Sequence, residues 1–151
     1  MQPLIETWEI NNRINLYLLN AIPENNLKDV SASKGRSVGE QFAHIHAVRL
    51  MWLKVAAPEL LEGLNKIDKT NITKKQLADE LAKSAAAMGT VMKKGFETGK
   101  IKGFKPHASA FFGYFISHES HHRGQIMLAL KQSGHPVDQK IQYGLWEWGS
   151  R

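Results

Sequence analysis

Three histidines and a glutamate fall within five consecutive residues, and side chains of these types can bind or activate a metal ion. Residues 118–122 read HESHH, so His118, Glu119 and His122 satisfy the pattern H-E-x-x-H. In zinc proteases this pattern places two metal ligands and a general base on one helix. The same residues also fit a metal site of another class, or a histidine-rich helix that binds nothing. Which alternative holds depends on the secondary-structure elements that position the motif.

The composition describes one globular domain over residues 1–151 and removes several classes of site. Of the 151 residues, 42% are hydrophobic and 23% are charged, which is typical of a folded domain of this length. The absence of cysteine excludes disulfides, cysteine-based zinc sites and cysteine nucleophiles. The first residues lack the pattern of a signal peptide, and no apolar run approaches about 18 residues. We therefore expect a cytoplasmic protein without a membrane span.

The positive charge of the chain raises the question of nucleic-acid binding. The formal net charge is +6, from 20 basic and 14 acidic residues. The lysines, however, are scattered as pairs and near loops, without a dense stripe or interleaved aromatic residues. A solvated basic surface explains this distribution better, so we do not expect nucleic acid as a partner.

Four long segments have the period of amphipathic helices. They are residues 3–20, 37–57, 73–99 and 108–132. Ser37 and Glu40 form a capping box at the start of the second segment, and Pro58 ends it. No segment alternates with the period of a strand. The sequence therefore predicts an all-α protein, an antiparallel four-helix bundle followed by a short C-terminal tail.

The helical phase of the fourth segment separates its histidines. At about 100° per residue, His118 and His122 lie within about 40° of each other. They share the apolar, core-facing side of the segment with Phe115. By the same phase His121 lies to one side of the pair, and Glu119 lies toward the edge of the apolar stripe. Two imidazoles one turn apart suit the chelation of one metal ion.

The second segment supplies a partner for this pair. His44 lines up with apolar residues such as Met51, whereas His46 points the opposite way. A single histidine on an apolar stripe is more often a hydrogen-bonded core residue than a ligand. Two histidines one turn apart, with a third on another helix of the same small bundle, favour a metal site made by His44, His118 and His122.

Two other classes of metal site fit less well. Metzincins need a glycine and a third histidine further along the helix, but Gln125 and Leu128 occupy those positions. The other common zinc-protease arrangement needs a glutamate ligand on a later helix, and only Glu147 follows, in the tail. A di-iron carboxylate site needs E-x-x-H on two helices, whereas Glu40 and His44 are four residues apart.

Several stretches of the chain are similar to a known family. They are GEQFAHIHAVRLMWL in the second helix, HESHHRGQI in the fourth, the ending QYGLWEWGSR and the position of Trp8 in the first helix. Over nearly its whole length the chain resembles the DinB/YfiT-like family of bacterial four-helix-bundle proteins. In that family three histidines bind a divalent metal ion, commonly zinc or nickel. For this chain we expect zinc or nickel, with manganese or iron as alternatives. The resemblance places the ligands at His44, His118 and His122, and implies that Glu119 occupies a variable position.

The resemblance says less about the reaction. Related branches are thiol-dependent S-transferases or isomerases, and three neutral imidazoles leave open positions on a metal for water or a thiolate. We therefore expect a metal-dependent enzyme of thiol S-transferase or hydrolase type. Its substrate would be an unidentified small molecule, with a low-molecular-weight thiol as the candidate cosubstrate. The alternative is a non-catalytic, metal-stabilised or metal-sensing bundle in a stress or DNA-damage response.

Four residues near the histidines are candidates for further roles. Arg123 can steer an anionic group, and His121 or Glu119 can move a proton at the edge of the pocket. Gly124 lies in the middle of the helix, where glycine costs about 1 kcal/mol relative to alanine. This cost indicates that another group approaches the backbone at that position.

The second helix is apolar nearly all round, which predicts a homodimer. Met51 and Val55 lie on one side of it and Phe42 on the other. A four-helix bundle buries only part of each helix, so the remaining apolar side needs a cover. A second copy of the chain would supply it through a two-fold interface. The tail, with Trp146 and Trp148, is the alternative cover.

Overall fold

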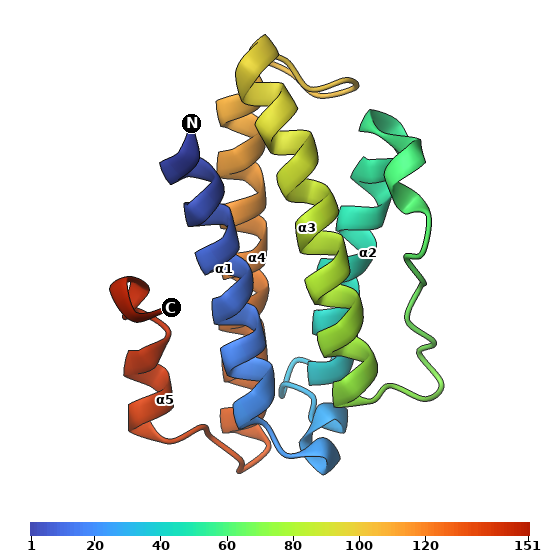
Figure 1. Cartoon of the computed structure of the whole chain (residues 1–151). Helices are drawn as coiled ribbons and strands as arrows, with labels where there is room; N and C mark the ends of the chain where they lie inside the picture. The colour runs from blue at the N-terminus through green and yellow to red at the C-terminus, as the bar shows by residue number, and fades with distance from the viewer.

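The chain folds into a bundle of helices without a β-strand (Figure 1). The computed structural model describes residues 1 to 151. The long helices are α1 (Gln2–Ala21), α2 (Val38–Ala56), α3 (Lys74–Thr98) and α4 (Ala108–Gln132). The short ones are α5 (Gln139–Gly144) and the 3₁₀ helices η1 (Glu24–Lys28), η2 (Pro58–Leu61) and η3 (Trp148–Ser150). The prediction of an all-α four-helix bundle is confirmed.

The long helices do not all alternate in direction, so the expectation of a bundle that is antiparallel throughout needs a correction. Both α2 and α3 begin near the end of α1, where the Lys74 Nζ donates to the carbonyl of Asn20 over 2.9 Å. The connection of residues 57–73 returns along the bundle, so α2 and α3 are parallel neighbours (Figure 1). The packed pairs α1–α3 and α2–α4 are antiparallel.

The helix boundaries follow from local capping. The Ser37 hydroxyl accepts from the Glu40 N–H over 3.2 Å, and the Glu40 carboxylate accepts from the Ser37 N–H over 2.8 Å. This is the capping box expected from the sequence. At the other end of the bundle α3 is capped by Gly99, whose φ of +76° is the left-handed conformation that glycine adopts without strain. The chain can therefore turn directly from α3 toward α4.

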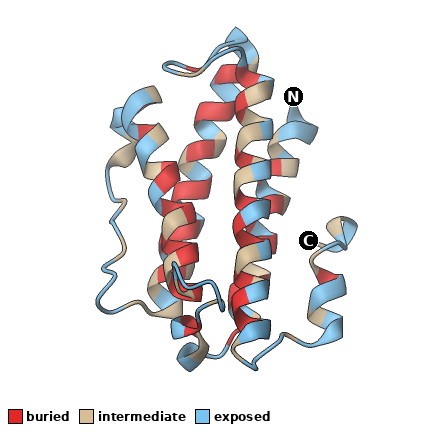
Figure 2. Cartoon of the chain, turned by 180° about the vertical axis from the view of Figure 1, so that it is seen from behind, coloured by how far each residue is buried: buried red, intermediate tan, exposed pale blue.

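The core has two apolar halves with a polar layer between them. One half surrounds Leu18 and Phe42, and the other surrounds Trp8 and Phe115. Figure 2 shows the buried residues on the inward sides of the long helices. Between the two halves lie buried polar side chains from the middle of all four long helices. They are Asn11, Asn15, Arg49, Ser84 and Glu119.

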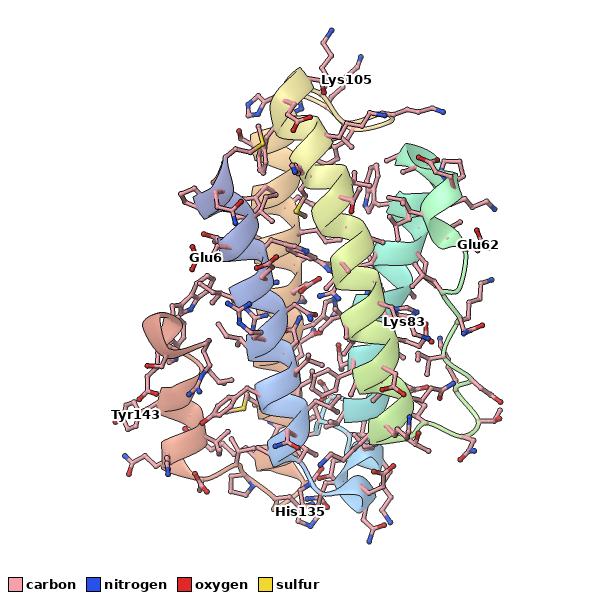
Figure 3. The ribbon with its side chains drawn as sticks, viewed as in Figure 1. Glu6, Glu62, Lys83, Lys105, His135 and Tyr143 are labelled. Atoms are coloured by element: carbon pink, nitrogen blue, oxygen red, sulfur yellow. The ribbon has the colours of Figure 1, made fainter.

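The surface is polar over most of the bundle, and the tail covers a side other than the one expected. Charged side chains such as Glu6, Glu62 and Lys105 extend into solvent (Figure 3). The tail lies beside α1 and α4, where the Arg151 guanidinium lies 3.8 Å from the centre of the Tyr17 ring (Figure 1). No helix combines the length and the apolar character needed to cross a membrane.

Helix α2 therefore keeps an apolar strip, Met51 and Val55, that the rest of the chain covers only in part. The side chains of Met51 and Val55 are 51% and 41% exposed. The alternative that the tail with Trp146 and Trp148 covers this side of α2 is wrong, because the tail packs on the opposite side of the bundle. The other side of α2, which carries Phe42, is buried in the core.

Candidate metal centre

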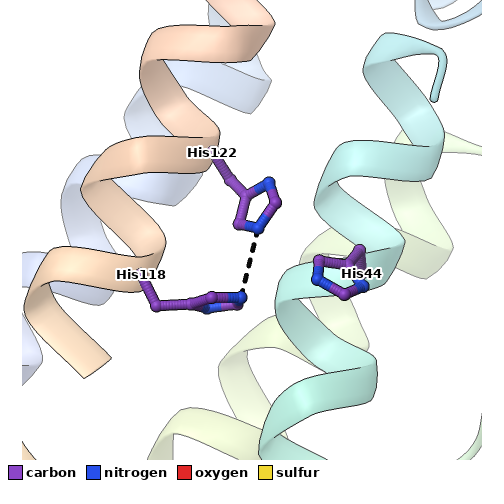
Figure 4. Close-up of side chains that lie close together, drawn as sticks. All are labelled: His44, His118 and His122. Carbon is purple, nitrogen blue, oxygen red and sulfur yellow. Dashed lines mark hydrogen bonds between the residues drawn. The ribbon is translucent and has the colours of Figure 1, made fainter. Parts of the chain in front are cut away.

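Three histidines converge between α2 and α4. Figure 4 shows His118 and His122 extending from α4 toward His44 on α2. One ring nitrogen of each lies within 4.8 Å of the other two. The Nε2 atoms of His118 and His122 are 3.1 Å apart, and the ring centre of His44 is 4.7 Å from that of His122. The structure thus brings together the three histidines selected from the sequence.

The side of α2 that faces the core differs from the expected one. His44 was expected on a core-facing stripe, but it is half-buried at the rim of the bundle, on the same side as the exposed Met51. His46 is the core histidine, with 1% of its surface exposed. Its ring nitrogens lie 3.0 Å from the Ser84 hydroxyl and 2.7 Å from the Asn65 carbonyl. Both nitrogens of His46 are used, so this histidine is not available to the cluster.

A glutamine holds His122 in the tautomer that a metal needs. The Nδ1 of His122 lies 2.6 Å from the Oε1 of Gln41 on α2. An amide oxygen can only accept, so Nδ1 carries the proton and donates it to Gln41. The lone pair is then on Nε2, which points into the cluster. Outer-shell partners of this kind fix the orientation of histidine ligands in metal sites.

The surroundings keep the cluster neutral. Burial, followed by the neighbouring His118 and His44, lowers the pKa of His122 to about 4. Burial and the charge of Arg36 lower the pKa of His44, and burial likewise lowers the pKa of His118. Lys69 contributes in the same direction at His44. Since metal ions bind neutral imidazole, the side chains are in the ligand form at pH 7 without losing a proton.

The donor set and its spacing fit a divalent ion. Two nitrogens bound to one zinc ion at about 2.0–2.1 Å in tetrahedral geometry are about 3.3 Å apart. The observed 3.1 Å between the nitrogens of His118 and His122 is close to this value. The Nδ1 of His118 is buried without a hydrogen-bond partner, so only the orientation of its ring against Tyr114, 5.9 Å away, positions it. The cluster could therefore hold a divalent metal ion through three imidazole nitrogens.

Glu119 lies in the core, and the expectation that it lies at the edge of the pocket is wrong. The residue is fully buried. Its Oε1 accepts from the Arg49 Nε over 2.7 Å, and its Oε2 accepts from the Arg49 Nη2 over 2.9 Å. The amides of Asn11 and Asn15 donate to the same Oε2, each over 2.7 Å. Burial raises the pKa of Glu119, but Arg49 outweighs it, and the pKa is below its ordinary value.

The two other candidates lie on different sides of α4. Arg123 is buried and faces α1, where its Nη1 donates to the Oδ1 of Asn11 over 2.9 Å and of Asn15 over 2.6 Å. It points away from α2 and the histidine cluster. His121 is exposed, and its ring centre lies 5.0 Å from that of His122. Only His121 is therefore beside the cluster.

The polar layer was not predicted from the sequence, although a signal was present. Asn11 and Asn15 are one turn apart and fall on the same side of α1 as Trp8 and Leu18, which are core residues. Two amides on the apolar side of a helix require buried partners. That pattern indicates a buried polar network, but it does not say that Arg49 supplies the charge.

A helical bundle in which histidines of two helices face one another fits a class of helical proteins that hold a metal ion between their helices. The comparison with protein families makes the assignment narrower. The family model described as "DinB family" matches residues 1–148 of the chain. The chain therefore belongs to this family. The resemblance seen in the sequence is thereby confirmed. Neither the curated proteins nor the solved structures include a match to this chain.

Proposed function

We propose that the protein is a metal-dependent enzyme of thiol S-transferase or hydrolase type. Its divalent ion, zinc or nickel in the first place and manganese or iron in the second, is held by His44, His118 and His122. The observation that carries the proposal is the convergence of three neutral imidazoles, one of them oriented by Gln41. Softer nitrogen ligands suit zinc and nickel better than they suit manganese.

The number and the exposure of the ligands favour a catalytic site over a structural one. Structural zinc is bound by four protein ligands, whereas catalytic zinc has three and keeps a position for water or substrate. His44 and His118 are only half-buried, so the open side of the cluster faces solvent. A bound ion would supply a lowered pKa for a coordinated water or thiol near neutral pH.

The residues around the cluster suggest how a substrate is held. The positive charges of Arg36 and Lys69 lower the pKa of His44. The entrance to the site, which is the solvent-facing side of the histidine cluster, is therefore positively charged. This charge favours an anionic substrate or cosubstrate. The chain has no cysteine, so the thiol would come from a low-molecular-weight cosubstrate. His121, exposed beside His122, is in place to take up or release a proton at the entrance.

The experiment compares metal-loaded and chelated protein with a panel of small thiols and electrophilic acceptors, and with activated esters. The expected result is turnover that disappears on chelation and returns with zinc or nickel. His122→Ala should lack this turnover, while Lys83→Ala, on the exposed side of α3, should retain it. Stoichiometric metal without turnover across the panel would favour the non-catalytic, metal-stabilised or metal-sensing alternative.

We also propose that the protein forms a homodimer through the apolar strip on α2. The support is the exposure of Met51 and Val55 together with the position of the tail, which packs on α1 and α4 and leaves the strip open. A second copy would bury the strip against its own equivalent. A cytoplasmic location stays a prediction.

A further inference from the structure

A cavity lies on the other side of α4 from the histidine cluster. It has a volume of about 580 Å³ and is lined by residues of α4 and the tail. At about 100° per residue, its α4 residues Ser120, Arg123 and Gly124 lie on the side of the helix away from His118 and His122. Cavities of about 300–1,000 Å³ are typical of sites for small molecules. This cavity is therefore a candidate binding site that is separate from the metal centre.

The buried guanidinium of Arg123 lines the cavity, and two of its nitrogens have no hydrogen-bond acceptor in the protein. The guanidinium of Arg123 uses Nη1 for the two asparagines of α1, whereas its Nε and Nη2 donate to no protein atom. The side chain is nevertheless 8% exposed, which is low for an arginine. Buried arginines normally satisfy their planar set of donors with carboxylates or phosphates. Arg123 lacks such a partner within the chain.

The buried group formed by Arg49, Arg123 and Glu119 also has more positive than negative charge. Arg49 and Arg123 bring two guanidinium groups, while Glu119 brings one carboxylate, which leaves a net charge of +1. Both oxygens of Glu119 accept from Arg49, so the carboxylate is committed to that residue. A buried charge without a counter-charge is costly. An anion in the cavity would balance the cluster.

Apart from Gln142, the rest of the cavity is apolar and aromatic. Side chains of Ile116, Met127, Leu145 and Trp148 line it, and Trp146 stands at its rim with 79% of its surface exposed. The indole ring of Trp146 is therefore free to contact a ligand in the cavity. The lining therefore suits a ligand with a flat or apolar body.

Gly124 opens the wall of the cavity. A Cβ atom placed there would meet no heavy atom within 4 Å, so no other group of the protein approaches this backbone. Glycine is a poorer helix former than alanine at such a position. Its effect is to leave open space where a side chain would enter the cavity.

We propose that this cavity binds a small organic carboxylate with an aromatic or apolar body. The carboxylate accepts from the Nε and Nη2 of Arg123, and the body packs against Leu145, Trp146 and Trp148 beside Gly124. The site lies across α4 from the metal centre and does not rest on the reaction proposed above.

The test uses 1-naphthylacetate as the probe and 1-naphthylacetamide as its neutral counterpart, with calorimetric titration of the full-length protein. The expected result is one saturable site for the acid and binding of the amide at least about tenfold weaker, since hydrogen bonds to a charged acceptor are stronger than those to a neutral one. Affinity should be the same with and without metal. No binding of the acid at millimolar concentration, or equal binding of acid and amide, would overturn the proposal.

Two variants separate the cavity from the rest of the surface. Gly124→Leu should fill the cavity and weaken binding of the acid at least about tenfold, while helix content is kept because leucine is the better helix former. Gly113→Leu is the matched control, because Gly113 has equally open surroundings on α4 and does not line the cavity. It should bind the acid as the unmodified protein does. Undiminished binding by Gly124→Leu would place the ligand elsewhere and refute the proposal.

Discussion

The buried ion pair in the polar layer allows a prediction that depends on charge more than on packing. Arg49 and Glu119 are both fully buried and joined by two hydrogen bonds of 2.7 and 2.9 Å. Two substitutions break the pair from opposite ends. Glu119→Gln keeps the size of the side chain and removes the negative charge, whereas Arg49→Met removes a positive charge and keeps an apolar stem of similar reach.

The expected magnitudes differ because Arg123 is the third charge of the cluster. Removing one partner of a buried ion pair costs about 3–5 kcal/mol. Glu119→Gln raises the buried net charge from +1 to +2 and removes the only carboxylate of the buried group, the one bound to Arg49, so we expect a cost of about 5 kcal/mol. Arg49→Met lets Arg123 and Glu119 balance, and two asparagine amides still bind the carboxylate, so we expect about 3 kcal/mol. Both are large fractions of the 5–15 kcal/mol or so by which domains are stable.

The assay is urea unfolding at pH 7 in the presence of a chelator, followed by circular dichroism, so that metal binding does not contribute. At this pH Glu119 is ionised, because Arg49 outweighs burial and holds the pKa of Glu119 below its ordinary value. Asp79→Asn is the control, since it removes an exposed ion pair with Lys75 and should leave the unfolding midpoint unchanged. Equal costs for the two substitutions, or a larger cost for Arg49→Met, would refute the charge argument.

Three further predictions follow from the metal centre and from α2. First, metal binding at pH 6 should release fewer than about 1.5 protons, measured by calorimetry in buffers of different ionisation enthalpy, because the pKa of His122 is lowered to about 4. Three histidines with the ordinary pKa of 6.5 would release about 2.3 protons, and that value would contradict the lowered pKa. Second, Gln41→Leu should weaken zinc binding about 10–100-fold, because His122 would no longer be held in the tautomer with the proton on Nδ1. The control Gln76→Leu on α3 should leave zinc binding unchanged. An unchanged zinc affinity in Gln41→Leu would mean that Gln41 does not orient His122. Third, light scattering should give a mass near about 34 kDa, twice the 17.0 kDa of one chain, and Met51→Glu should shift it to the monomer; a monomer before substitution would contradict the interface on α2.

The parts of the fold that depend on local sequence were predicted well. The capping box at Ser37 and the spacing of His118 and His122 are properties of neighbouring residues, and the structure contains both as expected. The direction of α3 was not predicted, because it depends on the path of residues 57–73, which have no periodic pattern. Short connections would have made each long helix antiparallel to the next.

The orientation of α2 was missed for a different reason. Its apolar residues lie nearly all round the helix, so periodicity does not say which side faces the core. His46, and not His44, is therefore the core histidine of α2, although the choice of His44 for the cluster was unaffected. Glu119 was misplaced because its partner Arg49 is 70 residues away in the chain. Helical phase describes one helix at a time and contains no information on such pairs.

The central claim is that His44, His118 and His122 form one metal site. The most direct test is the metal content of protein made without a histidine tag, loaded with zinc or nickel, dialysed and measured by mass spectrometry of the elements. The account predicts one equivalent in the unmodified protein, loss of the metal in His44→Ala, His118→Ala and His122→Ala, and retention in His46→Ala and His121→Ala. Absence of stoichiometric metal in the unmodified protein, or loss of the metal in His121→Ala with retention in His118→Ala, would contradict it.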